Sequence, residues 1–148
     1  MSKIMKLLIV SVMTANLFAP LSVNAATPVK VTCAVVVDYL LNGVATESYQ
    51  KTFAVDPGLT FNDDFSTVTR QKFFSASTTL DAGNTVVNFS YFNDIGIADA
   101  IDFNSKLTLR DKGRVEATSG SYTFTTTAGG TPQQAHTINY TLSCKQPR

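Results

Sequence analysis

The sequence predicts an all-β fold: one small antiparallel β-sandwich or closed barrel of about eight strands, with its two ends joined by a disulfide. Apolar and polar residues alternate along several short segments, and a period of two is the side-chain repeat of a strand. Turn residues separate these segments about every eight to twelve residues. Beyond residue 25 no long apolar repeat at helical spacing occurs. Sandwich and barrel show the same alternation, so both stay open.

The first predicted strand, residues 30–41, carries one of only two cysteines. Cys33 is in phase with the apolar positions of that strand, and Cys144 is in phase with those of the last predicted strand, residues 137–145. Because both thiols are expected to face the core, we predict a structural Cys33–Cys144 bridge rather than a redox pair. Closing a loop of about 110 residues is worth about 4.7 kcal/mol in the chain-entropy model.

Between these ends, turn signals and alternation divide the chain into six further segments. Asn42-Gly43 fits the positive φ angles of a type I′ hairpin turn and separates the first two strands. Residues 61–65 are expected to form a loop with two aromatic anchors, and residues 93–104 an irregular acidic loop or one helical turn. The interior strands are expected at residues 46–55, 66–79, 85–92, 106–110, 114–118 and 121–127, with the pair 106–110 and 114–118 forming a hairpin.

Residues 1–25 have the pattern of a signal peptide: Lys3 and Lys6 precede an apolar run, and small residues occupy the cleavage position. We therefore expect residues 26–148 to form a single all-β domain that is exported to the periplasm or outside the cell. That part of the chain carries ten basic and eleven acidic residues with no run of one sign. We expect no nucleic-acid partner and no stable membrane insertion.

No residue pattern indicates catalysis, a metal or a cofactor. His136 is the only histidine, and metal sites usually recruit several His or Cys ligands, so we expect an ordinary surface or loop histidine. The chain has no G-x-S-x-G turn, and its aspartates are spaced in no selective way. We therefore expect no enzyme. The acids of residues 93–104 leave a calcium site as an open alternative, although they do not match the D-x-[DN]-x-[DN]-G spacing.

Four phenylalanines surround the region where the alternation is poorest: Phe61, Phe65, Phe73 and Phe74. Phe73 and Phe74 are adjacent, so in one strand they must point to opposite faces. One interpretation is that the four rings fill the core. The other is an exposed aromatic patch that contacts a protein or a glycan.

Ser119-Gly120-Ser121-Tyr122 resembles the S-G-x-x-Y element of periplasmic lysozyme inhibitors of small β-barrel fold, which also use a disulfide. The tyrosine comes one residue earlier in this chain. The tryptophan and lysine-glycine that follow in that family are absent, so the resemblance implies no residue roles.

The sequence favours an exported, non-enzymatic binding module for a protein, a glycan or a small apolar ligand. The alternative is a structural or surface-assembly subunit, pilus-like or part of a matrix, that offers an unpaired edge strand to a neighbour. The predicted bridge argues against exchange of the terminal strands, because it holds both within one chain. The oligomeric state stays open.

Overall fold

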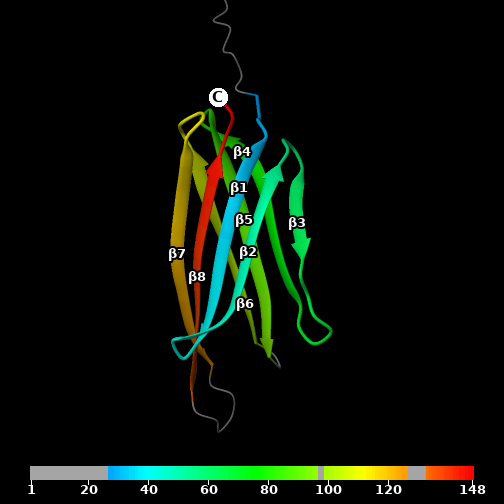
Figure 1. Ribbon diagram of the computed structural model, residues 1–148, viewed down its shortest axis with the longest axis vertical. Helices are drawn as coiled ribbons and strands as arrows, with labels where there is room; N and C mark the ends of the chain where they lie inside the picture. The colour runs from blue at the N-terminus through cyan, green and yellow to red at the C-terminus, as the bar shows by residue number, and fades with distance from the viewer. Residues whose placement is uncertain (1–26, 97–98, 127–132) are drawn as a thin grey trace, which may run out of the picture.

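The strands at the two ends of the domain lie side by side. In this computed structural model, which describes residues 27–96, 99–126 and 133–148, β1 (Val31–Leu41) pairs antiparallel with β8 (Gln134–Lys145) at the centre of one sheet (Figure 1). The other strands are β2 (Val44–Val55), β3 (Thr60–Asp64), β4 (Lys72–Asp81), β5 (Asn84–Gly96), β6 (Asp99–Leu109) and β7 (Val115–Thr126).

Two four-stranded antiparallel sheets pack face to face, with strand orders β2-β1-β8-β7 and β3-β4-β5-β6. Strands that follow one another in the chain are paired everywhere except at β2 to β3 and β6 to β7, where the chain crosses between the sheets. The chain order is thus that of an up-and-down ring, opened at two seams. The all-β prediction with about eight strands is confirmed, and the fold is a sandwich rather than a closed barrel.

The predicted bridge between the terminal strands is confirmed. Cys33 and Cys144 are direct partners in the β1–β8 register, their Cα atoms lie 4.1 Å apart, and both side chains are buried. Burial along β1 alternates as the sequence predicts, with Val35, Val37 and Tyr39 on the core side. The disulfide therefore links the two central strands of the first sheet from within the core.

The predicted hairpin turn at Asn42-Gly43 is also present. Asn42 has a φ of 50° and Gly43 a φ of 80°, the left-handed values that this turn requires. The start of β8 also holds Asn42 in place, because the Asn42 side-chain Oδ1 accepts a hydrogen bond of 2.9 Å from the Ala135 backbone N–H.

Two predicted loops are strands instead. Residues 60–64 form β3, which pairs with β4 and directs Phe61 toward the core. Most of residues 93–104 continues β5 and begins β6, so the irregular loop or helical turn predicted there is wrong. Pairing with a neighbouring strand supplies the backbone hydrogen bonds that local alternation does not reveal.

The predicted hairpin of residues 106–110 and 114–118 is wrong as well. These residues lie in β6 and β7, which belong to different sheets, and residues 110–114 carry the chain across between them. The predicted break at Ser119-Gly120 does not occur either, because β7 continues through it to Thr126. A turn that crosses between sheets has the same local composition as a hairpin turn.

The space between the sheets is filled by one cluster of buried apolar side chains from both sheets. Aromatic rings dominate one part of it, where Phe74 packs against Phe53 and Tyr49 across the sandwich. The described residues include no helix of the length and hydropathy needed to cross a membrane. The predicted signal peptide, residues 1–25, lies outside the described residues.

We expect joint replacement of both cysteines, Cys33→Ser with Cys144→Ser, to lower the free energy of unfolding by about 2–5 kcal/mol. The bridge spans a sequence separation of 111 residues, so the unfolded chain gains considerable entropy when it is removed. Urea denaturation followed by circular dichroism measures the loss. A reducing agent should destabilise the wild type and leave the double variant unchanged. Equal unfolding midpoints for the two oxidised proteins would contradict a stabilising role.

Candidate functional site

The outer face of the second sheet carries ordered rows of small polar side chains. The strand registers place outward residues of β3, β4, β5 and β6 directly beside one another. The rows are Thr60, Ser77, Asn88 and Lys106; Asn62, Ser75, Ser90 and Asn104; and Asp64, Phe73, Phe92 and Asp102. We call the outward side chains of the last three strands the β4–β6 face: Phe73, Ser75, Ser77, Asn88, Ser90, Phe92, Asp102, Asn104 and Lys106.

Two aromatic rings stack at one end of the β4–β6 face. Phe73 and Phe92 are direct cross-strand partners, and their ring centroids lie 5.0 Å apart at an interplanar angle of 12°. Phe73 is 43% exposed, although it belongs to a β4 segment whose next residue, Phe74, is completely buried. A flat apolar surface therefore stands in water next to the polar rows.

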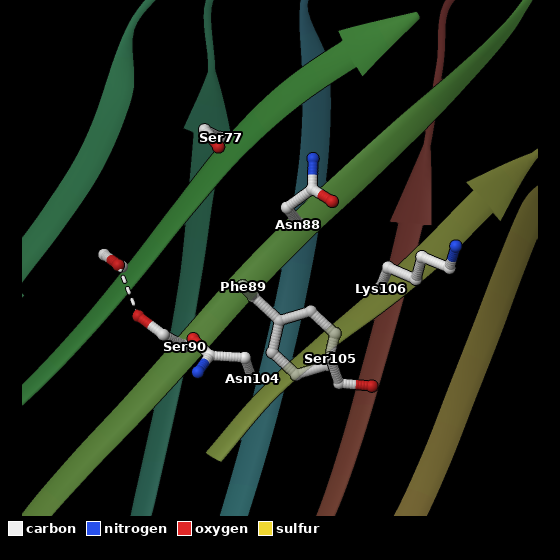
Figure 2. Close-up of a pocket in the computed structure, with 8 residues that line it drawn as sticks. Ser77, Asn88, Phe89, Ser90, Asn104, Ser105 and Lys106 are labelled. Carbon is white, nitrogen blue, oxygen red and sulfur yellow. Dashed lines mark hydrogen bonds between the residues drawn. The ribbon is translucent and has the colours of Figure 1, made fainter. Parts of the chain in front are cut away.

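A shallow depression of about 510 Å³ lies in the middle of the β4–β6 face (Figure 2). Serine and asparagine side chains line it because they are too short to fill the space between strands. The hydroxyl groups of Ser75 and Ser90 are hydrogen-bonded to each other at 2.6 Å. Asn88 Nδ2 donates a hydrogen bond of 3.0 Å to Thr79 Oγ1. Lys106 supplies the one charged side chain among the residues that line this depression.

The four phenylalanines named from the sequence separate in the structure. Phe74 lies in the core, and Phe61 and Phe65 are half-buried against it: Phe61 stacks on Phe53 at 4.5 Å and Phe65 on Tyr49 at 4.3 Å. Phe73 alone of the four is exposed. The four rings therefore form no common exposed patch, and the outward aromatic pair is Phe73 with Phe92.

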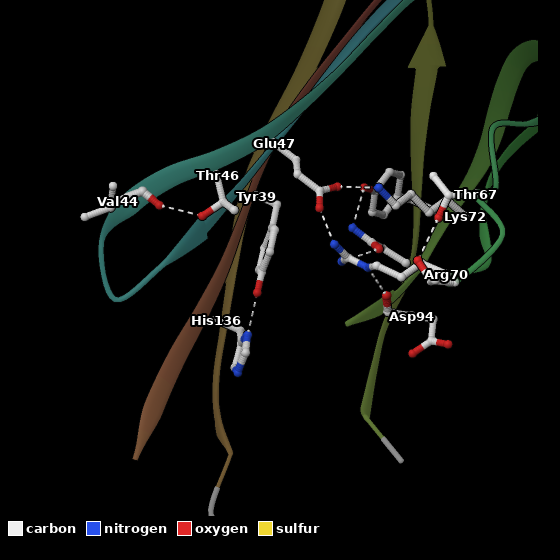
Figure 3. Close-up of polar contacts among 12 residues, drawn as sticks. Tyr39, Val44, Thr46, Glu47, Thr67, Arg70, Lys72, Asp94 and His136 are labelled. Carbon is white, nitrogen blue, oxygen red and sulfur yellow. Dashed lines mark hydrogen bonds and ion pairs between the residues drawn. The ribbon is translucent and has the colours of Figure 1, made fainter. Parts of the chain in front are cut away.

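Figure 3 shows a second polar cluster around Glu47. It lies toward the end of the sandwich away from the disulfide, because Cys33 is opposite Phe53 in the β1–β2 register and Glu47 is opposite Tyr39. Glu47 of β2 forms ion pairs with Arg70, from the β3–β4 loop, and with Lys72 of β4, whose Nζ lies 2.6 Å from Glu47 Oε2. Arg70 also donates to the Asp94 carbonyl oxygen at 2.6 Å and to Asn93 Oδ1 at 2.9 Å. These contacts join β2 of one sheet to β4 and β5 of the other, so they stabilise the open β2–β3 seam.

Further along the same seam, Asp63 accepts a hydrogen bond of 2.8 Å from Tyr49 Oη and pairs with Lys51 at 3.2 Å. Burial is the main cause that raises the pKa of the Tyr49 hydroxyl, and the bond to Asp63 raises it further. Burial also raises the pKa of Tyr91 to about 12. Both phenols therefore stay protonated at neutral pH and act as hydrogen-bonding core residues.

The Glu47 carboxyl is shifted in the opposite direction. Burial by itself disfavours its charged form, but the hydrogen bond from Lys72 and the positive charges of Arg70 and Lys72 outweigh that effect. Together they hold the pKa of Glu47 below its ordinary value. The cluster is thus an ionised, mutually satisfied group that holds two sheets together.

His136 is not the surface or loop histidine that the sequence predicts. It lies in β8, is 4% exposed, and its Nδ1 is 2.8 Å from the hydroxyl of Tyr39. Its ring also stacks on Phe124 at 5.0 Å. The even residues of β8 face the core. His136 follows that pattern because the Tyr39 hydroxyl is a hydrogen-bond partner for its Nδ1.

The described residues contain no group of three or more His, Cys, Asp or Glu side chains that could hold a metal ion. The acids proposed for a calcium site are distributed along two strands: Asp94 near the end of β5, Asp99 at the start of β6 and Asp102 on the outward face of β6. Part of that segment, residues 97 and 98, lies outside the described residues.

Of the residues on the β4–β6 face, only Phe73 is among the candidate contact residues predicted from the sequence. Phe92 follows Tyr91 in a strand whose odd residues are apolar, so the same alternation that predicted the core predicts that Phe92 points outward. The polar cluster around Glu47 left no such signal. Its members come from three strands and a loop, and only the crossing of the chain between sheets brings them together.

Neither a family model nor a curated protein sequence matches this chain.

The cluster at the sandwich end predicts acid-sensitive stability. Because the pKa of Glu47 is lower in the folded chain, its stabilising effect is present above the ordinary value of 4.5 and is lost as the pH falls through the folded value. We expect Glu47→Gln to cost about 1–2 kcal/mol at pH 7. The difference from the wild type should then shrink below about pH 4.5.

Urea midpoints measured from about pH 7 to about pH 3 test this expectation. Asp102→Asn is the control, because it removes an exposed carboxylate from β6 and should leave the midpoint at pH 7 nearly unchanged. A Glu47→Gln deficit that stays constant across the acid range would count against the assignment.

Proposed function

We propose that this protein is an exported, non-enzymatic binding module that holds a neutral glycan on its β4–β6 face. The observation that carries the proposal is the outward-facing Phe73–Phe92 stack, of which Phe73 is exposed, beside a depression lined by hydroxyl and amide groups. The C–H-rich face of a sugar ring packs on flat aromatic surfaces, and sugar hydroxyls exchange hydrogen bonds with serine and asparagine. Both halves of that chemistry stand next to each other on one rigid sheet.

The charge of the face supports a neutral ligand. The two polar rows contain hydroxyl and amide side chains with Lys106 as their single ion, and Asp102 and Asp64 flank the aromatic pair. A phosphate backbone would need several cations to displace its counterions. A strongly acidic ligand would find one cation, Lys106, in the two polar rows.

The size of the apolar area favours a glycan over a large protein partner. Protein interfaces depend on a central cluster of desolvated aromatic or arginine anchors. Here one ring pair stands at the edge of a polar surface. A small apolar ligand has less support still, because the space between the sheets is filled by the buried side chains of the core.

The proposal assigns no catalytic residue. Glu47, Arg70 and Lys72 are engaged with one another at the sandwich end, where they tie β2 to β4. Export is supported by the signal-like residues 1–25 and by the disulfide, which suits an oxidising compartment. In this view the mature protein acts in the periplasm or outside the cell.

Screening the oxidised protein against an array of neutral glycans, followed by calorimetric titration of the strongest ligand, tests the proposal. Phe73→Ala should weaken binding by about tenfold, because an aromatic stack contributes about 0.5–1.5 kcal/mol and 1.4 kcal/mol is a factor of ten. Phe73→Leu keeps the apolar character and removes the flat ring, so it should weaken binding similarly.

Val44→Ala is the matched control, since Val44 is an exposed apolar residue at the β1–β2 turn, away from the β4–β6 face. Its affinity should equal that of the wild type. The absence of any bound glycan on the array, or full affinity in Phe73→Ala, would overturn the proposal.

A further inference from the structure

We propose that β7 is a self-association edge: two copies of this chain pair antiparallel along β7 about a two-fold axis through Ser121. The inference does not depend on glycan binding. It rests on the exposed edge of the first sheet, on the groove at the β6–β7 seam and on the arrangement of side chains along β7.

The open sandwich has four edge strands, and three of them carry features that discourage pairing. Inward-pointing charges occupy the edge strand β2, where Glu47 and Lys51 form ion pairs with side chains beyond it. The edge strand β3 has only five residues, including Asp63 and Asp64. On β6 the outward positions include Asp102 and Lys106.

The fourth edge, β7, lacks these features. It is twelve residues long, and residues 117–126 contain no charged residue and no proline. Threonine, valine, tyrosine and phenylalanine make up most of it, and these residue types favour strands. An edge that is long, uncharged and unpaired is a template for another strand.

Two copies can pair along β7 with their outer sheet faces on the same side. Outward residues must pair with outward residues for the two sheets to join, and a two-fold axis through Ser121 meets that condition. It sets Thr123 opposite Ser119 and Thr125 opposite Ala117 on the outer face. Hydroxyl pairs of this kind already hold β7 to β8, where Thr123 Oγ1 and Thr137 Oγ1 are 2.9 Å apart.

On the inner side the same register sets Tyr122 of the second copy opposite Gly120. Tyr122 faces the core side, as its register partner Ile138 does, but it is 54% exposed because it stands at the open seam. Gly120 offers no side chain, and Tyr140 of β8 leans over it: an added Cβ would lie 2.6 Å from Tyr140 Oη. The incoming ring would therefore meet an aromatic surface.

That surface forms part of a groove of about 360 Å³ between β6 and β7, which Asp102 and Asn104 of β6 also line. Tyr140 stacks on Phe103 of β6 at 4.9 Å and bonds Ser105 Oγ at 3.0 Å, so its ring is held in place. An aromatic side chain opposite a strand glycine is a stabilising arrangement. The two-fold axis provides two such contacts, one in each direction, as a self-complementary interface requires.

A second copy fits this edge better than a strand of a different protein, because every feature that it would need is present on the edge itself. The occupant must supply an uncharged strand, hydroxyls for the outer face and one ring for the groove. β7 supplies all three in the correct register. The product is a closed dimer with an eight-stranded sheet, and the small interface should dissociate on dilution.

Size-exclusion chromatography with light scattering on the mature, oxidised protein tests the proposal, over concentrations of about 1 μM to 1 mM. We expect a monomer that converts to a dimer as concentration rises, with no larger species. Ser121→Lys places two like charges directly opposite each other and should abolish the dimer. Circular dichroism should show that this variant keeps its fold, because Ser121 is exposed.

Ser48→Lys is the matched control. Ser48 is an exposed serine on the same face and in the same cross-strand row as Ser121, but on β2 at the opposite edge of the sheet. It should dimerise like the wild type. A protein that is monomeric at every concentration, growth beyond the dimer, or equal effects of the two lysines would overturn the proposal.

The register has its own test. Under mild oxidation Ser121→Cys should form a disulfide-linked dimer, because the two cysteines would face each other across the axis. Thr123→Cys should stay unlinked, because its partner is then residue 119. Efficient linkage of Thr123→Cys in place of Ser121→Cys would refute the proposed axis.

Discussion

The pairing of β1 with β8 is the constraint on which the rest of the structure depends. It places the two ends of the domain in the middle of one sheet and sets Cys33 directly opposite Cys144. An eight-stranded meander whose ends pair is topologically a ring. A disulfide in that central pair then fixes the closure covalently, and any opening of the ring must occur elsewhere.

The ring opens where the chain crosses between sheets, and the two openings are stabilised by different chemistry. At the β2–β3 seam, ion pairs and hydrogen bonds around Glu47 and Asp63 join the sheets. At the β6–β7 seam, Tyr140 stacks on Phe103 and bonds Ser105. Charged groups protect one edge from other strands, whereas the second seam keeps an uncharged stretch, residues 117–126, beside the groove that contains Phe103 and Tyr140.

The two proposed surfaces lie on different sheets and meet at β6, where Asp102 and Asn104 of the β4–β6 face also line the groove beside β7. The β4–β6 face belongs to the outer side of one sheet, and β7 is the edge strand of the other. If both act, each dimer carries two glycan-binding faces, and binding to a repetitive glycan then gains from the raised effective concentration of the second site.

The sequence by itself determined the all-β class, the approximate number of strands and the pairing of Cys33 with Cys144, because a period of two and an in-phase cysteine are local signals. The same alternation placed Phe73 and Phe74 on opposite faces. Only the tertiary structure decided that the fold is a sandwich, that β6 and β7 lie in different sheets and that His136 is buried against Tyr39. Those features depend on which strands become neighbours, and local sequence does not encode how a turn crosses between sheets.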